Sequence, residues 1–248
     1  MLFHALFISP HLDDAVLSAG GEVARLTHDG KSACIVTVFT RAAAPVTRDA
    51  HGFIEESNEE NAELLFSKRR LEDRKAAGVL GAHHVHMGFI DALFRTLPNK
   101  SEPLYPAYKQ IFSGNISLND RLLCEQIRVG LQKIKNRQTD KRVRIYAPLG
   151  VGGHVDHIIT HLCVREIFPK QSIWWEDVPY RTHPIQLFKR LSEASCYNAT
   201  NKLIKNTLQY SKQKLNAVRC YKSQIAKLEY SGLSDIDYYA EAYYTHVK

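Results

Sequence analysis

Three residues with chemically active side chains stand close together near the start of the chain: His11, Asp13 and Asp14, in the run PHLDD. Histidine nitrogens and carboxylate oxygens are donors that a borderline metal such as Zn²⁺ accepts. Two adjacent carboxylates can point to different places, so one can bind a metal while the other accepts a proton from water. Helix capping is the alternative, because an Asp just before a helix commonly accepts a backbone hydrogen bond without any catalytic role.

A second group of such residues lies in the run GGHVDH. Its histidines, His154 and His157, are three positions apart and can therefore face the same side at the start of a helix. Asp156 stands between them, and a nearby carboxylate can receive a histidine ring N–H and orient the ring. The zincin pattern is excluded, because the pair His157 and His161 has Ile158 where that pattern needs Glu. Histidines that merely begin a helix are the structural alternative.

Both groups directly follow short apolar or β-branched segments that have the length of buried strands. Segments of this kind occupy residues 5–9, 32–40, 83–89, 142–147 and 172–176. Helical patterns lie between them, over Ala15–His28, about Asn58–Leu80, about Leu118–Lys135 and Val155–Phe168. This alternation predicts an α/β fold with a mostly parallel sheet and helices on both faces.

The predicted sheet also indicates where a site should form. Ligands of open α/β sheets bind beyond the carboxyl ends of the strands, and both motifs follow such ends. Residues 41–57 and 92–117 are rich in Pro, Thr, Asn and Ser, and we expect them to form long loops. Long loops in a compact domain are often rims or lids of sites.

The chain of 248 residues is long enough for one substantial core and short for two, so we expect a single domain over residues 1–248. From about residue 184 the pattern is mostly helical and polar, with a basic amphipathic stretch from Asn201 to Leu228 and a tyrosine-rich end. We expect this stretch to pack on the sheet as a terminal helix rather than to lie on a membrane surface.

The composition indicates which partners and which cellular location to expect. The net charge of +7 would suit a polyanion or an acidic substrate, but the basic residues are dispersed and no nucleic-acid-binding motif accompanies them. The chain has no recognisable signal peptide and no apolar run of about 18 residues, and its five cysteines are widely spaced. We therefore expect a cytoplasmic protein with no nucleic-acid partner and no membrane span; a homo-oligomer is compatible with the sequence.

Two segments, SPHLDDAVLSAGG from Ser9 to Gly21 and GHVDH from Gly153 to His157, together resemble the PIG-L/LmbE family of zinc-dependent N-deacetylases. The family has a [PA]HPDD motif and a later HxDH motif. This chain has Leu12 in place of the usual Pro, a change we expect to be tolerated because neither residue offers a ligand. The likeness continues over Arg69 to Gly81, Gly88 to Asp91, Trp175 to Tyr180 and Lys214 to Gln224.

The resemblance implies a Rossmann-like fold and a single divalent metal ion. It implies that His11, Asp14 and His157 are the metal ligands and that Asp13 is the general base. Zn²⁺ is the ion that the family suggests, and two histidines with one carboxylate also suit Fe²⁺ or another divalent metal.

The resemblance further implies roles for four other residues. His154 would stabilise the oxyanion or act as a general acid, and Asp156 would orient it. Arg69 and Asp91 would line the sugar pocket. An exposed arginine and an Asp in a turn at a strand end are the plain alternatives for these last two.

The expected reaction is hydrolysis of the N-acetyl group of a small amino sugar or glycoconjugate. An amidase acting on a larger thiol or peptide conjugate is one alternative, and a non-catalytic, metal-stabilised binding protein is another. The presence of both Asp13 and His154 speaks against the second, since metal binding alone requires neither. The sequence leaves the acceptor sugar open, because residues 41–57 and 92–117 are least similar to the family and are expected to set specificity.

Overall fold

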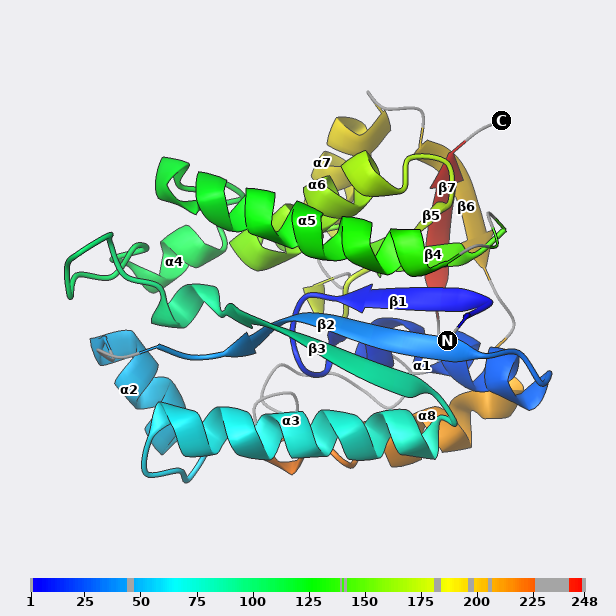
Figure 1. The fold of residues 1–248 in the computed structure, drawn as a ribbon, viewed down its shortest axis with the longest axis horizontal. Coiled ribbons are helices and arrows are strands. Elements are labelled where there is room, and N and C mark those ends of the chain that lie inside the picture. The colour runs from blue at the N-terminus through cyan, green and yellow to red at the C-terminus, as the bar shows by residue number, and fades with distance from the viewer. Residues whose placement is uncertain are drawn as a thin grey trace.

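The computed structural model describes residues 2–43, 47–138, 140, 142–180, 184–195, 199–204, 207–225 and 241–246. Within them, one seven-stranded sheet has the order β3-β2-β1-β4-β5-β7-β6 (Figure 1). The parallel strands are β1 (Ala5–Ser9), β2 (Ala33–Arg41), β3 (His83–Ile90), β4 (Arg144–Pro148) and β5 (Ser172–Trp175). Strand β7 (Ala242–His246) runs antiparallel to β5 and to β6 (Ala199–Ile204).

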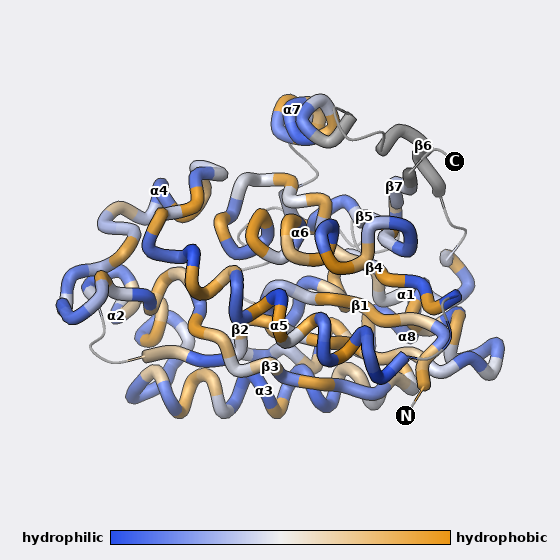
Figure 2. Tube along the Cα trace, turned by 45° about the horizontal axis from the view of Figure 1, so that its top comes forward, coloured by the Kyte–Doolittle hydropathy of each residue, from blue (hydrophilic) through white to orange (hydrophobic). Residues whose placement is uncertain are grey.

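Helices cover both faces of this sheet, which confirms the predicted α/β fold. On one face lie α1 (Asp14–His28), α3 (Ala62–Val79) and α8 (Ser211–Val218); on the other lie α5 (Arg121–Arg137) and α6 (Val155–Ile167) (Figure 1). Side chains of a strand alternate between the two faces. Accordingly, Phe7 of β1 packs in the core beneath α1, whereas Ile8 packs in the core beneath α6. Figure 2 shows β1 and β4 as apolar segments inside the molecule, and α3 as an alternation of polar and apolar residues.

The predicted strands and helices between residues 5 and 176 are present, with boundary shifts of a few residues, but the first predicted loop is wrong in part. Helix α2 (Arg48–Glu55) occupies the middle of residues 41–57. Thr47 accepts a hydrogen bond from Ala50 N and begins the helix, and Ile54 is buried on its inner side. The second predicted loop, residues 92–117, contains only the short helices η1 (Ala92–Phe94) and α4 (Tyr108–Ile111).

The C-terminal region contains two strands that the sequence pattern did not predict, besides α7 (Pro184–Ser195), η4 (Leu208–Tyr210) and α8. The expected helix from Asn201 to Leu228 therefore begins as strand β6, and α8 packs on α1 and α3 rather than directly on the sheet. Lys214 of α8 is buried and pairs with Glu241, 2.8 Å away, immediately before β7. The tyrosine pair Tyr238 and Tyr239 lies outside the described residues. In the part of the chain that is described, no helix is long and apolar enough to span a membrane.

Candidate metal centre

The first motif forms a short loop between β1 and α1. Ser9 Oγ donates to His11 O at 2.7 Å and accepts from Ala15 N at 3.0 Å, while His11 N donates to Asp14 Oδ2 at 2.8 Å. Asp13 occupies the N-cap position of α1, but its side chain makes no capping hydrogen bond. Capping therefore does not account for the carboxylate of Asp13, which remains available to the space beyond the strand.

The second motif follows β4 through a glycine turn that other residues would distort. Gly152 and Gly153 have φ angles of 90° and 71°, which L side chains rarely adopt. A Cβ on Gly152 would lie 2.4 Å from the ring of Tyr180, and one on Gly153 would lie 2.8 Å from the backbone oxygen of Phe112. The turn ends at His154, the N-cap of α6, whose Nδ1 accepts a hydrogen bond from the backbone N–H of its helix at 3.2 Å. The ring proton of neutral His154 therefore resides on Nε2.

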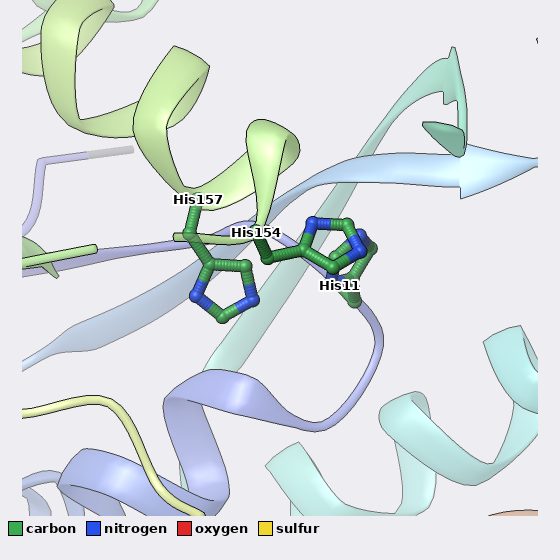
Figure 3. Close-up of side chains that lie close together, drawn as sticks. All are labelled: His11, His154 and His157. Carbon is green, nitrogen blue, oxygen red and sulfur yellow. The ribbon is translucent and has the colours of Figure 1, made fainter. Parts of the chain in front are cut away.

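The sheet brings the two motifs together, because β1 and β4 are neighbouring parallel strands and both motifs follow their carboxyl ends. Figure 3 shows the rings of His11, His154 and His157 directed toward a common space. The ring centroid of His11 lies 4.7 Å from that of His154 and 5.3 Å from that of His157. One nitrogen of each ring lies within 4.8 Å of the others.

Asp14 lies between two of these imidazoles. Its Oδ2 is 3.1 Å from Nδ1 of His11 and 3.3 Å from Nε2 of His157. Ligand atoms at about 2.0 Å from a tetrahedral Zn²⁺ are separated from one another by about 3.3 Å. The other nitrogen of each ring contacts a buried carboxylate: His11 Nε2 lies 3.1 Å from Asp156 Oδ2, and His157 Nδ1 lies 2.7 Å from Asp177 Oδ1. This pairing of histidine and carboxylate is usual around metal ligands, so the donor set fits a divalent metal ion.

Asp156 contacts the ring of His154 through its backbone N–H, at 3.2 Å, rather than through its carboxylate, so its role in orienting His154 stays a prediction. The carboxylate of Asp156 instead contacts His11, accepts a hydrogen bond from Ala92 N at 2.9 Å, and lies 2.7 Å from Nη1 of Arg95. The reason is local geometry: His154 caps α6 and turns its ring toward the backbone N–H of Asp156, while the Asp156 side chain points toward the loop after β1.

Burial and neighbouring charges separate the acid–base properties of the two adjacent aspartates. Burial and the negative charge of Asp14 raise the pKa of Asp13 to about 7. Burial alone would also raise the pKa of Asp14, but His157 and His11 outweigh it and hold that pKa well below its usual value. Burial and the charge of His11 lower the pKa of His154, which is therefore neutral at pH 7. Such divergent values at adjacent groups are typical of sites that move protons.

These residues open into a cavity of about 350 Å³. The polar residues that line it include the predicted residues His11, Asp13, Asp14, Arg69, Asp91 and His154. Apolar and aromatic residues also line it: Phe53, Leu93, Tyr108, Ile111, Phe112 and Tyr180. A larger cavity of about 640 Å³ beside α3, lined in part by Arg41 and Arg70, contains none of the predicted site residues.

The two predicted substrate residues, Arg69 and Asp91, both line the cavity of about 350 Å³. Arg69 is buried, its guanidinium lies over the rings of Phe53 and Phe66, and its Nη2 is 3.6 Å from Asp13 Oδ2. Asp91 caps η1 through a hydrogen bond from Leu93 N at 2.9 Å. The burial of Arg69 argues against the alternative of an exposed arginine, whereas Asp91 does fit the alternative of an Asp in a turn at a strand end.

Two residues at the centre were missed by the sequence analysis. Asp177 lies in the run WEDVPY, which resembles a family element, but the run by itself indicated no partner for the carboxylate. Arg95 lies in residues 92–117, where no motif marks it. Both contact the histidines or their carboxylates only because distant segments fold together.

Comparisons with known proteins show the family and the fold of this chain. The family model described as PIG-L, GlcNAc-PI de-N-acetylase, matches residues 6–168. A 2'-N-acetylparomamine deacetylase of Streptomyces fradiae is 30% identical over 179 residues, which are 71% of this chain and 57% of that protein. The chain thus spans little more than half the length of this curated relative.

The similar solved structures include the zinc-inhibited form of the teicoplanin deacetylase Orf2, with a TM-score of 0.79 and 24% identity, covering 97% of this chain and 96% of that one. They also include the A40926 pseudoaglycone deacetylase Dbv21, with a TM-score of 0.72 and 24% identity over the same shares of the two chains. At this identity the likeness shows a shared fold.

Proposed function

This chain belongs to the PIG-L family, and on that basis we propose that it is a metal-dependent N-deacetylase that removes an acetyl group from an amino sugar or glycoconjugate. The observation that carries the proposal is the position of Asp13, a carboxylate free of capping bonds beside a histidine and aspartate cluster in a cavity. The Streptomyces fradiae relative, named for its action on an N-acetylated amino sugar, supports the choice of substrate class.

The metal ligands in this proposal are His11, Asp14 and His157. The two distances of 3.1 and 3.3 Å from Asp14 Oδ2 to the histidine nitrogens agree with the edges of a tetrahedral site, about 3.3 Å. Zn²⁺ is the proposed ion, and the same ligands with open positions also suit Fe²⁺. Metal analysis of the purified protein distinguishes the two.

Two other groupings of nearby donors are less favourable. One replaces Asp14 by His154, but the carboxylate charge that stabilises a cation would be lost. The other combines His11 with Asp91 and Asp156, but the guanidinium of Arg95 already lies 2.7 Å from Asp156 and would repel a cation there.

His11, Asp14 and His157 would hold a divalent ion, which would lower the pKa of water and polarise a carbonyl oxygen. Asp13 accepts the proton of the attacking water, and its pKa of about 7 makes it a base at neutral pH. His154 is neutral and carries its proton on Nε2, so it donates a hydrogen bond to the oxyanion that develops on the acetyl group. Asp13 can then return the proton to the departing amine.

The walls of the cavity suit a sugar. Arg69 offers hydrogen-bond donors and Asp91 offers an acceptor for hydroxyl groups. Phe112 and Tyr180 offer apolar faces to the sugar ring or to an attached group. A non-catalytic binding protein would need neither the carboxylate of Asp13, which makes no capping hydrogen bond, nor the donor of His154.

The test compares Asp13→Ala with His11→Ala. Asp13→Ala should retain about one metal ion per chain and lose a factor of about 10²–10⁴ in turnover. His11→Ala should lose both metal and turnover, and Asp140→Ala, at an exposed carboxylate before the start of β4, should change neither. The assays are metal analysis and release of a primary amine from a panel of N-acetylated sugars, including 2'-N-acetylparomamine. Full turnover by metal-free Asp13→Ala protein would contradict the proposal.

A further inference from the structure

Arg95 is a buried arginine that lies behind the metal centre and outside the substrate cavity. Only 7% of its side chain is exposed. Its Nη1 lies 2.7 Å from Asp156 Oδ1 and donates to the backbone oxygen of Ile90 at 3.1 Å, and its Nε lies 3.2 Å from Asp120 Oδ1. A buried charge is stable only when it is paired, so the guanidinium and the two carboxylates depend on one another.

Aromatic rings fix the plane of this guanidinium. Its carbon lies 5.4 Å from the ring centre of Phe39 and 5.6 Å from that of Tyr105, distances at which a cation is attracted to a ring. Tyr105 is itself held, because its hydroxyl donates to Asp120 Oδ2 at 2.6 Å. The position of Arg95 is therefore determined by both the sheet and the segment that follows η1.

Asp156 connects Arg95 to the metal centre, because it contacts both Arg95 and His11. Its side chain is completely buried, and its Oδ2 accepts hydrogen bonds from His11 Nε2 at 3.1 Å and from Ala92 N at 2.9 Å. The opposite oxygen faces Arg95. When Nε2 of His11 is held in this way, Nδ1 is directed toward Asp14. Arg95, Asp156 and His11 thus form a continuous series of contacts that ends on a proposed ligand.

The carboxylate that contacts His157 is held in a different way from the one that contacts His11. Asp177, which contacts His157, is held by the backbone N–H groups of Gly150 and Val151 at 2.7 and 2.8 Å. Its orientation follows from the glycine turn itself. Asp156 receives one backbone N–H, and its second oxygen depends on the side chain of Arg95.

We propose that Arg95 is a positioning residue of the metal centre, which fixes the carboxylate of Asp156 and thereby the ring of His11. The inference rests on the proposed metal site and adds a residue to it. Without the guanidinium, a completely buried carboxylate loses its ion-pair partner, and the carboxylate can rotate away from His11. Loss of a carboxylate that orients a metal-binding histidine typically weakens metal binding about 10- to 100-fold.

The test measures the Zn²⁺ dissociation constant of the full chain by competition with a chromogenic chelator. Arg95→Gln should bind Zn²⁺ about 10- to 100-fold more weakly and alter the absorption spectrum of bound Co²⁺. Arg95→Lys should fall between the wild type and Arg95→Gln, because lysine retains the charge but not the fork that reaches both carboxylates. Arg25→Gln is the matched control: Arg25 pairs with the buried Glu22 at 2.7 Å on α1, so this variant should lose stability and keep its Zn²⁺ affinity.

Thermal unfolding of the metal-free proteins establishes that each variant is folded. If Arg95→Gln does not fold, Asp120→Asn takes its place, since it leaves Arg95 and Asp156 intact and should weaken Zn²⁺ binding to a smaller extent. Wild-type Zn²⁺ affinity and an unchanged Co²⁺ spectrum in the folded variant would overturn the proposal. A wild-type protein that binds Zn²⁺ but releases no amine would instead overturn the proposed function alone, and one that binds no divalent ion would overturn both.

Discussion

Asp177 Oδ1 lies 2.7 Å from Nδ1 of His157, and each of the two side chains is only 1% exposed. The contact turns Nε2 of His157 toward Asp14, 3.3 Å away. The other oxygen of Asp177 accepts two backbone hydrogen bonds from the turn that precedes α6. One carboxylate therefore orients a proposed ligand and holds the turn that carries it.

Replacing Asp177 by Asn should weaken Zn²⁺ binding about 10- to 100-fold. The two oxygens of Asp177 face three N–H groups: the ring N–H of His157 and two backbone N–H groups. An Asn side chain has only one oxygen, so its NH₂ group must face either the ring N–H of His157 or the backbone N–H groups. Chelator competition measures the affinity, with Asp140→Asn as the exposed control. An unchanged affinity would show that the contact with His157 does not support a ligand.

Replacing His154 by Asn should leave the metal content unchanged and reduce turnover by about 10²–10³. Asn is a good N-cap, so the start of α6 should be preserved while the Nε2–H donor is lost. Metal analysis and steady-state kinetics separate the two effects. If this variant lost its metal, the ligand set would be His11, His154 and His157 instead.

Removing the metal should lower the melting temperature. A ligand present at 100 times its dissociation constant stabilises the folded state by about 2.7 kcal/mol. For a chain of this size each kcal/mol shifts the melting temperature by about 2–4 °C, so a chelator should lower it by about 5–10 °C. Thermal unfolding with and without EDTA checks this, and His157→Ala should be insensitive to EDTA. A shift of equal size in that variant would mean that the stabilising ion binds elsewhere.

Replacing Arg69 by Gln should move the acidic limb of the kcat profile to higher pH. The positive charge of Arg69 lowers the pKa of Asp13, opposing burial and Asp14, so its removal raises that pKa further. A general base acts when deprotonated, and activity would then be lost at a higher pH than in the wild type. Arg70→Gln is the control, because Arg70 donates to Thr40 O and does not line the cavity of Asp13. Superimposable profiles for both variants would contradict the prediction.

Replacing Gly153 by Ala should lower the free energy of unfolding by about 1–3 kcal/mol and reduce turnover, because a positive φ is strained for alanine. Its Cβ would lie 2.8 Å from the Phe112 oxygen and displace that segment, which lines the cavity. Gly78→Ala is the matched control: it lies in α3 with nothing within 4 Å of the new Cβ, so the substitution should stabilise by about 0.4–1 kcal/mol. Urea unfolding measures both, and equal effects would rule out the local explanation.

The fold could largely be predicted from the sequence. Strands β1 to β5 and helices α1, α3, α5 and α6 follow from apolar runs and helical periods within short segments, and the structure confirms the α/β sheet covered on both faces. Helix α2 and strands β6 and β7 were not predicted. Helix α2 lies in a polar segment, and β7 is a strand because it pairs with β5 and β6, from which it is distant in sequence.

For the candidate site, the sequence by itself determined which residue types follow β1 and β4, and parallel strands placed both groups at one edge. The roles of His11, Asp13, Asp14, His154 and His157 remain predictions. Only the tertiary structure decided that the carboxylate of Asp156 contacts His11, while its backbone N–H contacts His154. It also brought in Arg95, which no motif marks, and Asp177, whose run WEDVPY resembles a family element but indicates no partner for the carboxylate. The physical reason is that a buried carboxylate is oriented by whichever donors the packing of distant segments brings within hydrogen-bond distance, and no local pattern records that packing.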